Sequence, residues 1–231
     1  MIVLGIHSTT PSLGVALIED SRVLEEQILP PSRQHLENLA IAVRELMNRQ
    51  GVSLKHLDGL GVATGPGSFS GIRVGLAMAK GMALALSIPV AGLSTLEILA
   101  WQALDGGEVG VPVIDARRGE VYTAFYRKVK GSLEVTVGPM LIAADLLLRR
   151  LDKAGEQFVL CGDPVLDDRV RGISYVVRSP VRIPSPAVCA LLALERIRRG
   201  DGHGAHEVLP VYIRRSDAEE NREKRKQNNP G

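Results

Sequence analysis

Residues 60–86 read LGVATGPGSFSGIRVGLAMAKGMALAL, and this stretch indicates the fold class. Its first residues are short and apolar, which predicts a buried β-strand over residues 60–64. A glycine-rich turn follows at residues 65–68, and the periodicity of the remainder predicts a helix over residues 71–86. A strand, a glycine turn and a helix in succession are typical of an α/β protein.

The chain before this stretch predicts three strands and one helix. The strands at residues 2–6, 14–18 and 22–28 follow one another closely, which is typical of an antiparallel meander. Apolar residues at three- and four-residue steps then predict a helix over residues 33–50, and Gly51 is placed to end it in a left-handed cap. The apolar face of this helix carries Leu36, Leu39, Val43 and Met47.

The chain after this stretch predicts a second, smaller unit. A strand at residues 88–91 and a helix at residues 95–104, with Ser94 and Glu97 as its capping box, complete the first unit. The order of three strands, helix, strand, helix, strand and helix matches one ribonuclease-H-like lobe. Gly106 and Gly107 form a candidate linker, after which the pattern partly restarts. We therefore predict an actin-like (ribonuclease-H-like) two-lobe α/β fold with a reduced second lobe. The predicted boundaries are residues 1–104, residues 105–213 and a charged, solvated tail at residues 214–231.

Composition excludes several classes of protein. A hydrophobic content of 45% argues against disorder, and the net charge of +2 with 3% aromatic residues argues against an autonomous nucleic-acid binder. Cys161 and Cys189 belong to no CxxC pair, which predicts two reduced, buried thiols. The chain opens without the basic region of a signal peptide, and the uncharged residues 81–96 are too few for a membrane span. We expect a soluble, cytoplasmic protein.

Two turns are the candidates for nucleotide chemistry. The first, residues 5–10, carries His7 where this architecture usually holds a magnesium-binding aspartate, and imidazole is a poor magnesium ligand. The second precedes a helix N-terminus, a position that suits anions, so Gly65, Gly67 and Ser68 are the candidate nucleotide-binding residues. The loop matches neither GxGxxG nor a P-loop.

Other catalytic patterns fail on inspection of the sequence. No HExxH occurs, and His203 and His206 read as a solvent-exposed pair. The run at residues 67–71 has Phe69 where a GxSxG elbow needs serine, so Ser68 is expected to cap the helix. We therefore predict no catalytic residue, no metal ligand and no cofactor. Arg117 and Arg118 fit either an ion-paired turn with Glu120 or contact with an anionic partner.

One stripe of the helix at residues 71–86 consists of small residues. Interior glycine costs a helix about 1 kcal/mol, so such a stripe is best explained by another backbone packed closely against it. That backbone belongs either to this chain or to a partner subunit. The stripe contains Gly71, Gly75, Ala79 and Ala83.

Four segments in order resemble the signature of the TsaB (YeaZ) family. They are residues 65–75, GPGSFSGIRVG, the segment Ile6, Ser8 and Thr9, residues 115–122, DARRGEVY, and residues 210–214, PVYIR. Together they span almost the whole chain, whereas His7 departs from the aspartate common at its position in that family.

The resemblance implies a function as well as the actin-like fold. It implies a non-catalytic subunit that pairs with a TsaD-type subunit, which transfers threonylcarbamoyl to the adenosine next to the tRNA anticodon. It also implies a TsaE-type ATPase as a further partner, a homodimer when the chain is alone, and contact with tRNA only through the complex. Pairing in the family uses the first-lobe helices. The predicted partner-binding residues are Leu36, Leu39, Val43, Met47, Gly71, Gly75, Ala79, Met82 and Ala83.

Two other functions remain as alternatives. The first is an ATP-dependent transferase or peptidase of the same fold that acts on its own. The second is an RNA-binding module that uses the basic residues of the tail, namely Arg214, Arg215, Arg222, Lys224, Arg225 and Lys226.

Overall fold

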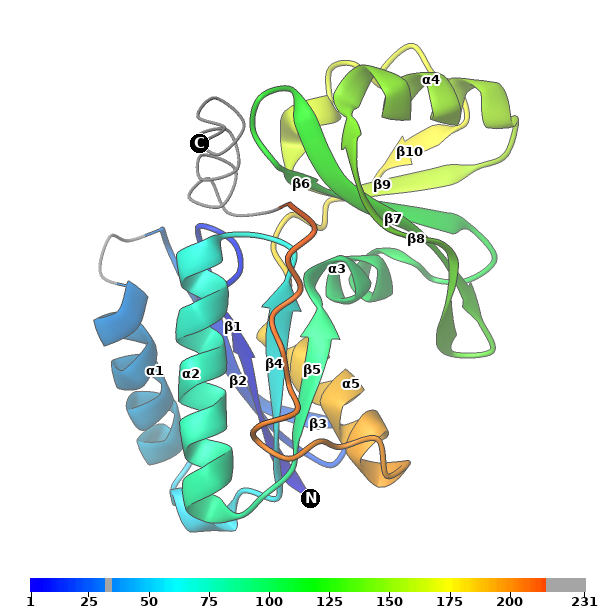
Figure 1. Cartoon of the computed structure of the whole chain (residues 1–231). Helices are drawn as coiled ribbons and strands as arrows, with labels where there is room; N and C mark the ends of the chain where they lie inside the picture. The colour runs from blue at the N-terminus through cyan, green and yellow to red at the C-terminus, as the bar shows by residue number, and fades with distance from the viewer. Residues whose placement is uncertain (32–34, 215–231) are drawn as a thin grey trace, which may run out of the picture.

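The computed structural model describes residues 1–31 and 35–214, without the side chains of residues 35–37. The chain forms two lobes, each built on a five-stranded sheet (Figure 1). The first sheet has the order β3-β2-β1-β4-β5, in which β1–β2–β3 is the predicted antiparallel meander and β4 and β5 run parallel to β1. Its strands are β1 (Ile2–His7), β2 (Leu13–Glu19), β3 (Arg22–Leu29), β4 (Gly59–Gly65) and β5 (Val90–Ser94).

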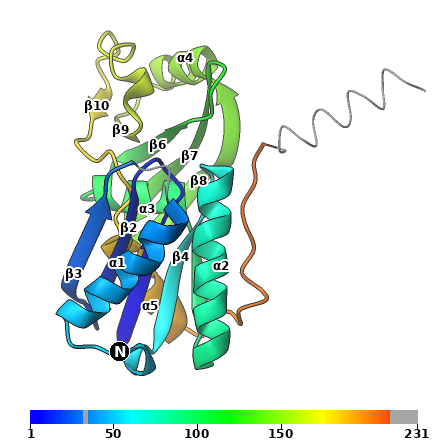
Figure 2. The same ribbon diagram turned by 90° about the vertical axis from the view of Figure 1, so that its left-hand side faces the viewer.

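Helices cover both faces of the first sheet. On one face lie α1 (His35–Arg49) and α2 (Phe69–Leu86), and on the other lies α5 (Pro186–Arg198) (Figures 1 and 2). Glycines in the central strands let α5 approach closely, because a Cβ on Gly5 would lie 2.0 Å from the carbonyl oxygen of Pro186. Gly51 has φ of +64° and ends α1 in the predicted left-handed conformation.

The second lobe repeats the order of strands with fewer helices. Its sheet has the order β10-β9-β6-β7-β8, and α4 (Ala144–Ala154) packs on one face of it. The other face meets α3 (Thr95–Ala103), so α3 lies in the core between the two lobes. The strands are β6 (Val109–Asp115), β7 (Glu120–Val129), β8 (Ser132–Ala143), β9 (Phe158–Gly162) and β10 (Val176–Arg178); two short 3-10 helices are η1 (Leu54–His56) and η2 (Pro164–Leu166).

The predicted boundary at residues 105–213 is wrong for the end of the chain. Helix α5 packs on β1, β2, β4 and β5 of the first lobe, and residues 203–211 pair with its strands. The second lobe is therefore an insertion, and the chain returns to the first lobe after β10. The physical reason is that the apolar outer faces of the central strands need a helix over them, and no helix of residues 1–104 supplies that cover.

The predicted capping box at Ser94 is also wrong. The Ser94 side chain makes no cap hydrogen bond, and Glu97 instead receives two hydrogen bonds from the Arg196 guanidinium at 2.6 and 2.7 Å. A bidentate pair with a charged partner is stronger than a neutral cap, so Glu97 serves to join α3 to α5.

The small-residue stripe of α2 packs within its own lobe, which corrects the prediction that it docks on a partner. A Cβ on Gly71 would lie 1.9 Å from the carbonyl oxygen of Ser8, and one on Gly75 would lie 2.4 Å from Ser8 Oγ. Ala79 and Ala83 are buried in the core of the first lobe. The backbone packed closely against α2 is therefore the turn after β1.

The apolar face predicted for α1 is also buried within the first lobe. Leu39, Val43 and Met47 are at most 4% exposed and pack in the first-lobe core, so they are not available to a partner. Met82 on α2 is half-buried against that core, and the side chain of Leu36 lies outside the described residues.

We expect Gly71→Ala to lower the free energy of unfolding by about 1–3 kcal/mol, because the new methyl group collides with a backbone oxygen. The matched control is Gly81→Ala on the same helix, where nothing lies within 4 Å of the new Cβ, so higher helix propensity should add about 1 kcal/mol. Urea unfolding of dilute protein measures both. Equal effects of the two substitutions would contradict the packing of the stripe.

Candidate partner-docking face and interlobe cleft

A cleft of about 960 Å³ separates the two lobes. Residues that follow β4, β6 and β9 line it, so the carboxyl ends of strands from both sheets face it. Ligands of open α/β sheets bind at such ends. The cleft is therefore where the candidate nucleotide loop and the first turn meet the second lobe.

His7 lies at the end of β1 as a fully buried, neutral imidazole. Its Nε2 is 3.0 Å from Thr10 Oγ1 and its Nδ1 is 3.2 Å from Thr9 Oγ1, which in turn accepts a hydrogen bond of 2.8 Å from Thr95 Oγ1. Burial lowers the pKa of His7 to about 3. The side chain therefore joins β1, the first turn and α3 through a chain of hydroxyl groups.

The glycine loop before α2 packs directly on the first turn. A Cβ on Gly67 would lie 2.1 Å from Thr9 O, and the Ser68 N–H donates to the same oxygen at 2.7 Å. Ser68 Oγ accepts a hydrogen bond from Gly71 N, which confirms the predicted cap. Gly67 and Ser68 thus have a packing role that sequence reasoning did not give them, and nucleotide binding by the loop stays a prediction.

Two aspartates line the second-lobe wall of the cleft. Asp163 Oδ2 accepts a hydrogen bond of 2.7 Å from Asp115 N, and burial raises the pKa of Asp163. Arg117 pairs with the Asp115 carboxylate at 3.2 Å, so the predicted ion-paired turn exists for Arg117 with a different acid. Within residues 1–31 and 35–214, no three His, Cys, Asp or Glu side chains gather as metal ligands.

Sequence reasoning missed Asp163 as a cleft residue. The available signal was its place directly after a predicted strand, since polar groups at carboxyl strand ends meet at one edge of a sheet. It also assigned Glu120 to the arginine turn, whereas Glu120 pairs with Arg214.

The thiols follow the prediction. Cys161 and Cys189 are free and fully buried, and burial raises the pKa of each to about 12. Such thiols are inert as nucleophiles.

The outward face of α2 is apolar and open. Arg73 and Lys80 are its only charged residues, and Leu84 is 64% exposed. Of the helices described, α2 alone is long and apolar enough to cross a membrane by length and composition, and about a third of it is buried in this chain. The exposed residues Ala77, Gly81 and Ala85 share one face with Val74 and Met78, which are half-buried against the first-lobe core, and we call these five residues the docking face.

A second small-residue stripe therefore lies on the docking face. Ala77, Gly81 and Ala85 repeat at four-residue spacing, as the buried stripe does, and within residues 1–31 and 35–214 nothing lies within 4 Å of a Cβ on Gly81. Both stripes were visible in the sequence. Their spacing does not say which of them faces the core, so sequence reasoning chose the wrong one.

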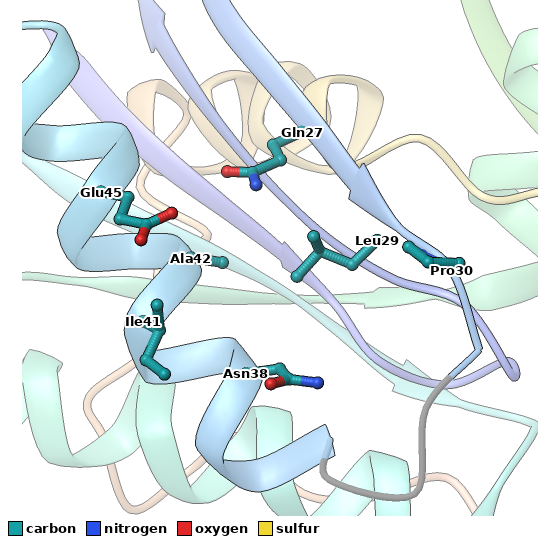
Figure 3. A pocket seen from close by; sticks show the side chains of 7 residues that line it. All are labelled: Gln27, Leu29, Pro30, Asn38, Ile41, Ala42 and Glu45. Carbon is teal, nitrogen blue, oxygen red and sulfur yellow. The ribbon is translucent and has the colours of Figure 1, made fainter.

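On its side towards the edge strand β3, α1 forms a shallow groove of about 340 Å³ with that strand (Figure 3). Ile41, 42% exposed, projects from α1 beside this groove, opposite Leu29 and Pro30.

Comparisons with known proteins fit this architecture. The family model of tRNA N6-adenosine threonylcarbamoyltransferase (TsaD) matches residues 22–161, more than half of the chain. The tRNA threonylcarbamoyladenosine biosynthesis protein TsaB of Bacillus subtilis is 31% identical over 95% of this chain and 96% of its own length. This chain belongs to the TsaB family.

Further relatives agree with membership of the TsaB family. The TsaB of Escherichia coli is 29% identical over 94% of this chain and 96% of its own length. A solved structure of an uncharacterized protein with similarity to peptidase YEAZ from Pseudomonas aeruginosa is 27% identical. It superposes with a TM-score of 0.78 over 92% of this chain and 99% of its own. The predicted actin-like two-lobe α/β fold is therefore confirmed.

We expect the buried imidazole of His7 to lower the free energy of unfolding as the pH decreases. Unfolded His7 takes up a proton near its ordinary pKa of 6.5, whereas the folded side chain stays neutral down to about 3, so protons favour the unfolded chain between these values. Between pH 7.5 and 5 this costs about 2 kcal/mol. Unfolding of His7→Asn, measured over the same range, should lose this part of the slope. An unchanged slope would refute the buried neutral state.

Proposed function

We propose that the chain is a non-catalytic partner subunit in threonylcarbamoyl transfer to tRNA. In this proposal it pairs with a TsaD-type subunit that performs the transfer to the adenosine next to the anticodon. A TsaE-type ATPase joins the pair, and tRNA is met only through the complex. The setting is the cytoplasm, and the chain forms a homodimer when the catalytic subunit is absent.

The docking face carries this proposal. Six of the 18 residues of α2 are buried and five are half-buried, and its exposed apolar side chains include Ala77, Leu84 and Ala85. Burial of such surface contributes about 25 cal/mol per Å², so a second protein surface over it is stabilising. The small residues Ala77, Gly81 and Ala85 admit a facing helix to short distance. The TsaD family model matches this chain itself, so the proposed partner shares its fold and offers equivalent helices.

The cleft supports a subunit without chemistry of its own. The first turn carries the buried, neutral His7 and no carboxylate at this position. In the adjoining loop the Ser68 N–H donates to Thr9 O and is therefore not free to bind a phosphate. Asp115 is paired with Arg117. The alternative, a transferase or peptidase acting alone, rests on the description of one solved relative by its similarity to a peptidase.

We expect Gly81→Arg to abolish pairing with a TsaD-type subunit, because a long charged side chain replaces the smallest residue of the docking face. The monomer should fold normally, since no described residue lies within 4 Å of a Cβ at this position. Leu146→Arg, at an exposed apolar position on α4 of the second lobe, is the control and should pair as the wild type does. Sedimentation of each variant with the partner measures both. Normal pairing of Gly81→Arg would place the interface elsewhere.

The non-catalytic role predicts that cleft carboxylates are dispensable. Asp115→Asn and Asp163→Asn should each leave the rate of threonylcarbamoyl transfer by the reconstituted complex within about twofold of the wild type, since neither acts as acid or base. Omission of the chain should abolish or greatly reduce the rate. A loss of 100-fold or more in either variant, with pairing intact, would instead favour chemistry in this subunit.

A further inference from the structure

The end of the described chain links the two lobes across the cleft. After α5, residues 203–214 run beside α2 along the first lobe towards the second (Figures 1 and 2). His203 exchanges two backbone hydrogen bonds of 3.0 Å with Val90 at the edge of the first sheet, and Val208 is buried in the first-lobe core. This segment is thus fixed to the first lobe before it reaches the cleft.

Two contacts fix the segment at the cleft itself. Val211 N donates to Thr64 O at 2.8 Å, and its carbonyl oxygen lies where a Cβ on Gly65 would be only 2.7 Å away. Gly65 has φ of +112°, so both its conformation and the close approach of Val211 require glycine. The Tyr212 ring stacks on Phe69 at the start of α2, with ring centroids 4.8 Å apart.

Arg214 then crosses to the second lobe. Its Nη1 donates to Ala116 O at 2.5 Å and its Nη2 pairs with the Glu120 carboxylate, so the guanidinium holds both sides of the β6–β7 turn. The Arg214 side chain is only 15% exposed, which lessens screening of this charge-assisted pair by water. Lysine has no planar fork with which to hold both acceptors.

Elsewhere the lobes meet through α3, whose buried residues pack on the second sheet, and through two covalent crossings, from α3 to β6 and from β10 to α5. Gln102 ties these two crossings together: it donates to Ile183 O at 3.3 Å and accepts from Ser185 N at 2.8 Å. The contact made by Arg214 adds a link across the cleft, from the arginine side chain to the β6–β7 turn.

We propose that residues 208–214 form a clamp that fixes the angle between the lobes, with Arg214 as its latch and Phe69, Thr64 and Gly65 as its seat. Phe69 belongs to the first turn of α2, and the Arg73 guanidinium lies 3.9 Å over its ring. The helix that carries the docking face therefore also seats the clamp. In this proposal the clamp also fixes how the second lobe is oriented relative to a partner bound on the docking face. The clamp itself does not depend on the proposed partner role.

Distances between spin labels test the clamp in the full chain. Labels at Val23→Cys on β3 and Leu146→Cys on α4 report on the two lobes, and the native thiols are buried and should not react. We expect one narrow distance distribution in the otherwise unaltered protein. Arg214→Ala and Tyr212→Ala should each broaden it. Backbone hydrogen exchange of residues 208–214 should become about tenfold faster in both.

The control is Arg198→Ala, which removes an arginine paired with Asp20 inside the first lobe. It should leave the distance distribution unchanged, and circular dichroism should show native secondary structure in all three variants. Distributions of Arg214→Ala and Tyr212→Ala that superpose on the parent would overturn the proposal. So would the same broadening in Arg198→Ala, because the effect would then be general destabilisation.

Discussion

The contact between the first turn and the start of α2 is the constraint on which much else depends. Ser8 Oγ donates to Gly71 O at 2.8 Å, while Ser8 O occupies the space that a side chain on Gly71 would need. Backbone therefore meets backbone at this point, and only one rotation of α2 about its axis permits it. That rotation decides which side of the helix is core and which side is open.

Three features follow from this single orientation. The stripe of Gly75, Ala79 and Ala83 turns into the core, and the stripe of Ala77, Gly81 and Ala85 turns outward. The loop before α2 is drawn onto Thr9, which occupies the Ser68 N–H. Phe69 comes to the mouth of the cleft, where the Tyr212 ring meets it. The docking face, the packing of the glycine loop on Thr9 and the position of Phe69 under Tyr212 thus all follow from the orientation of α2.

The first turn also shows how the fold accommodates a buried histidine at the end of β1. A buried charge would need a partner, whereas the neutral imidazole of His7 is satisfied by two threonine hydroxyls. On the second-lobe side of the cleft, Asp115 and Asp163 are held in place by hydrogen bonds from neighbouring backbone N–H groups, and Asp115 is also paired with Arg117.

The sequence alone determined the order of strands and helices, the left-handed cap at Gly51 and the cap at Ser68, because these depend on periodicity and on neighbours within a few residues. Four short motifs were sufficient for the family. Only the tertiary structure decided which stripe of α2 faces outward, that α5 returns to the first lobe, and that Glu97 binds Arg196 and Arg214 binds Glu120. Those facts join residues about 100 positions apart, and local spacing carries no information about such pairs.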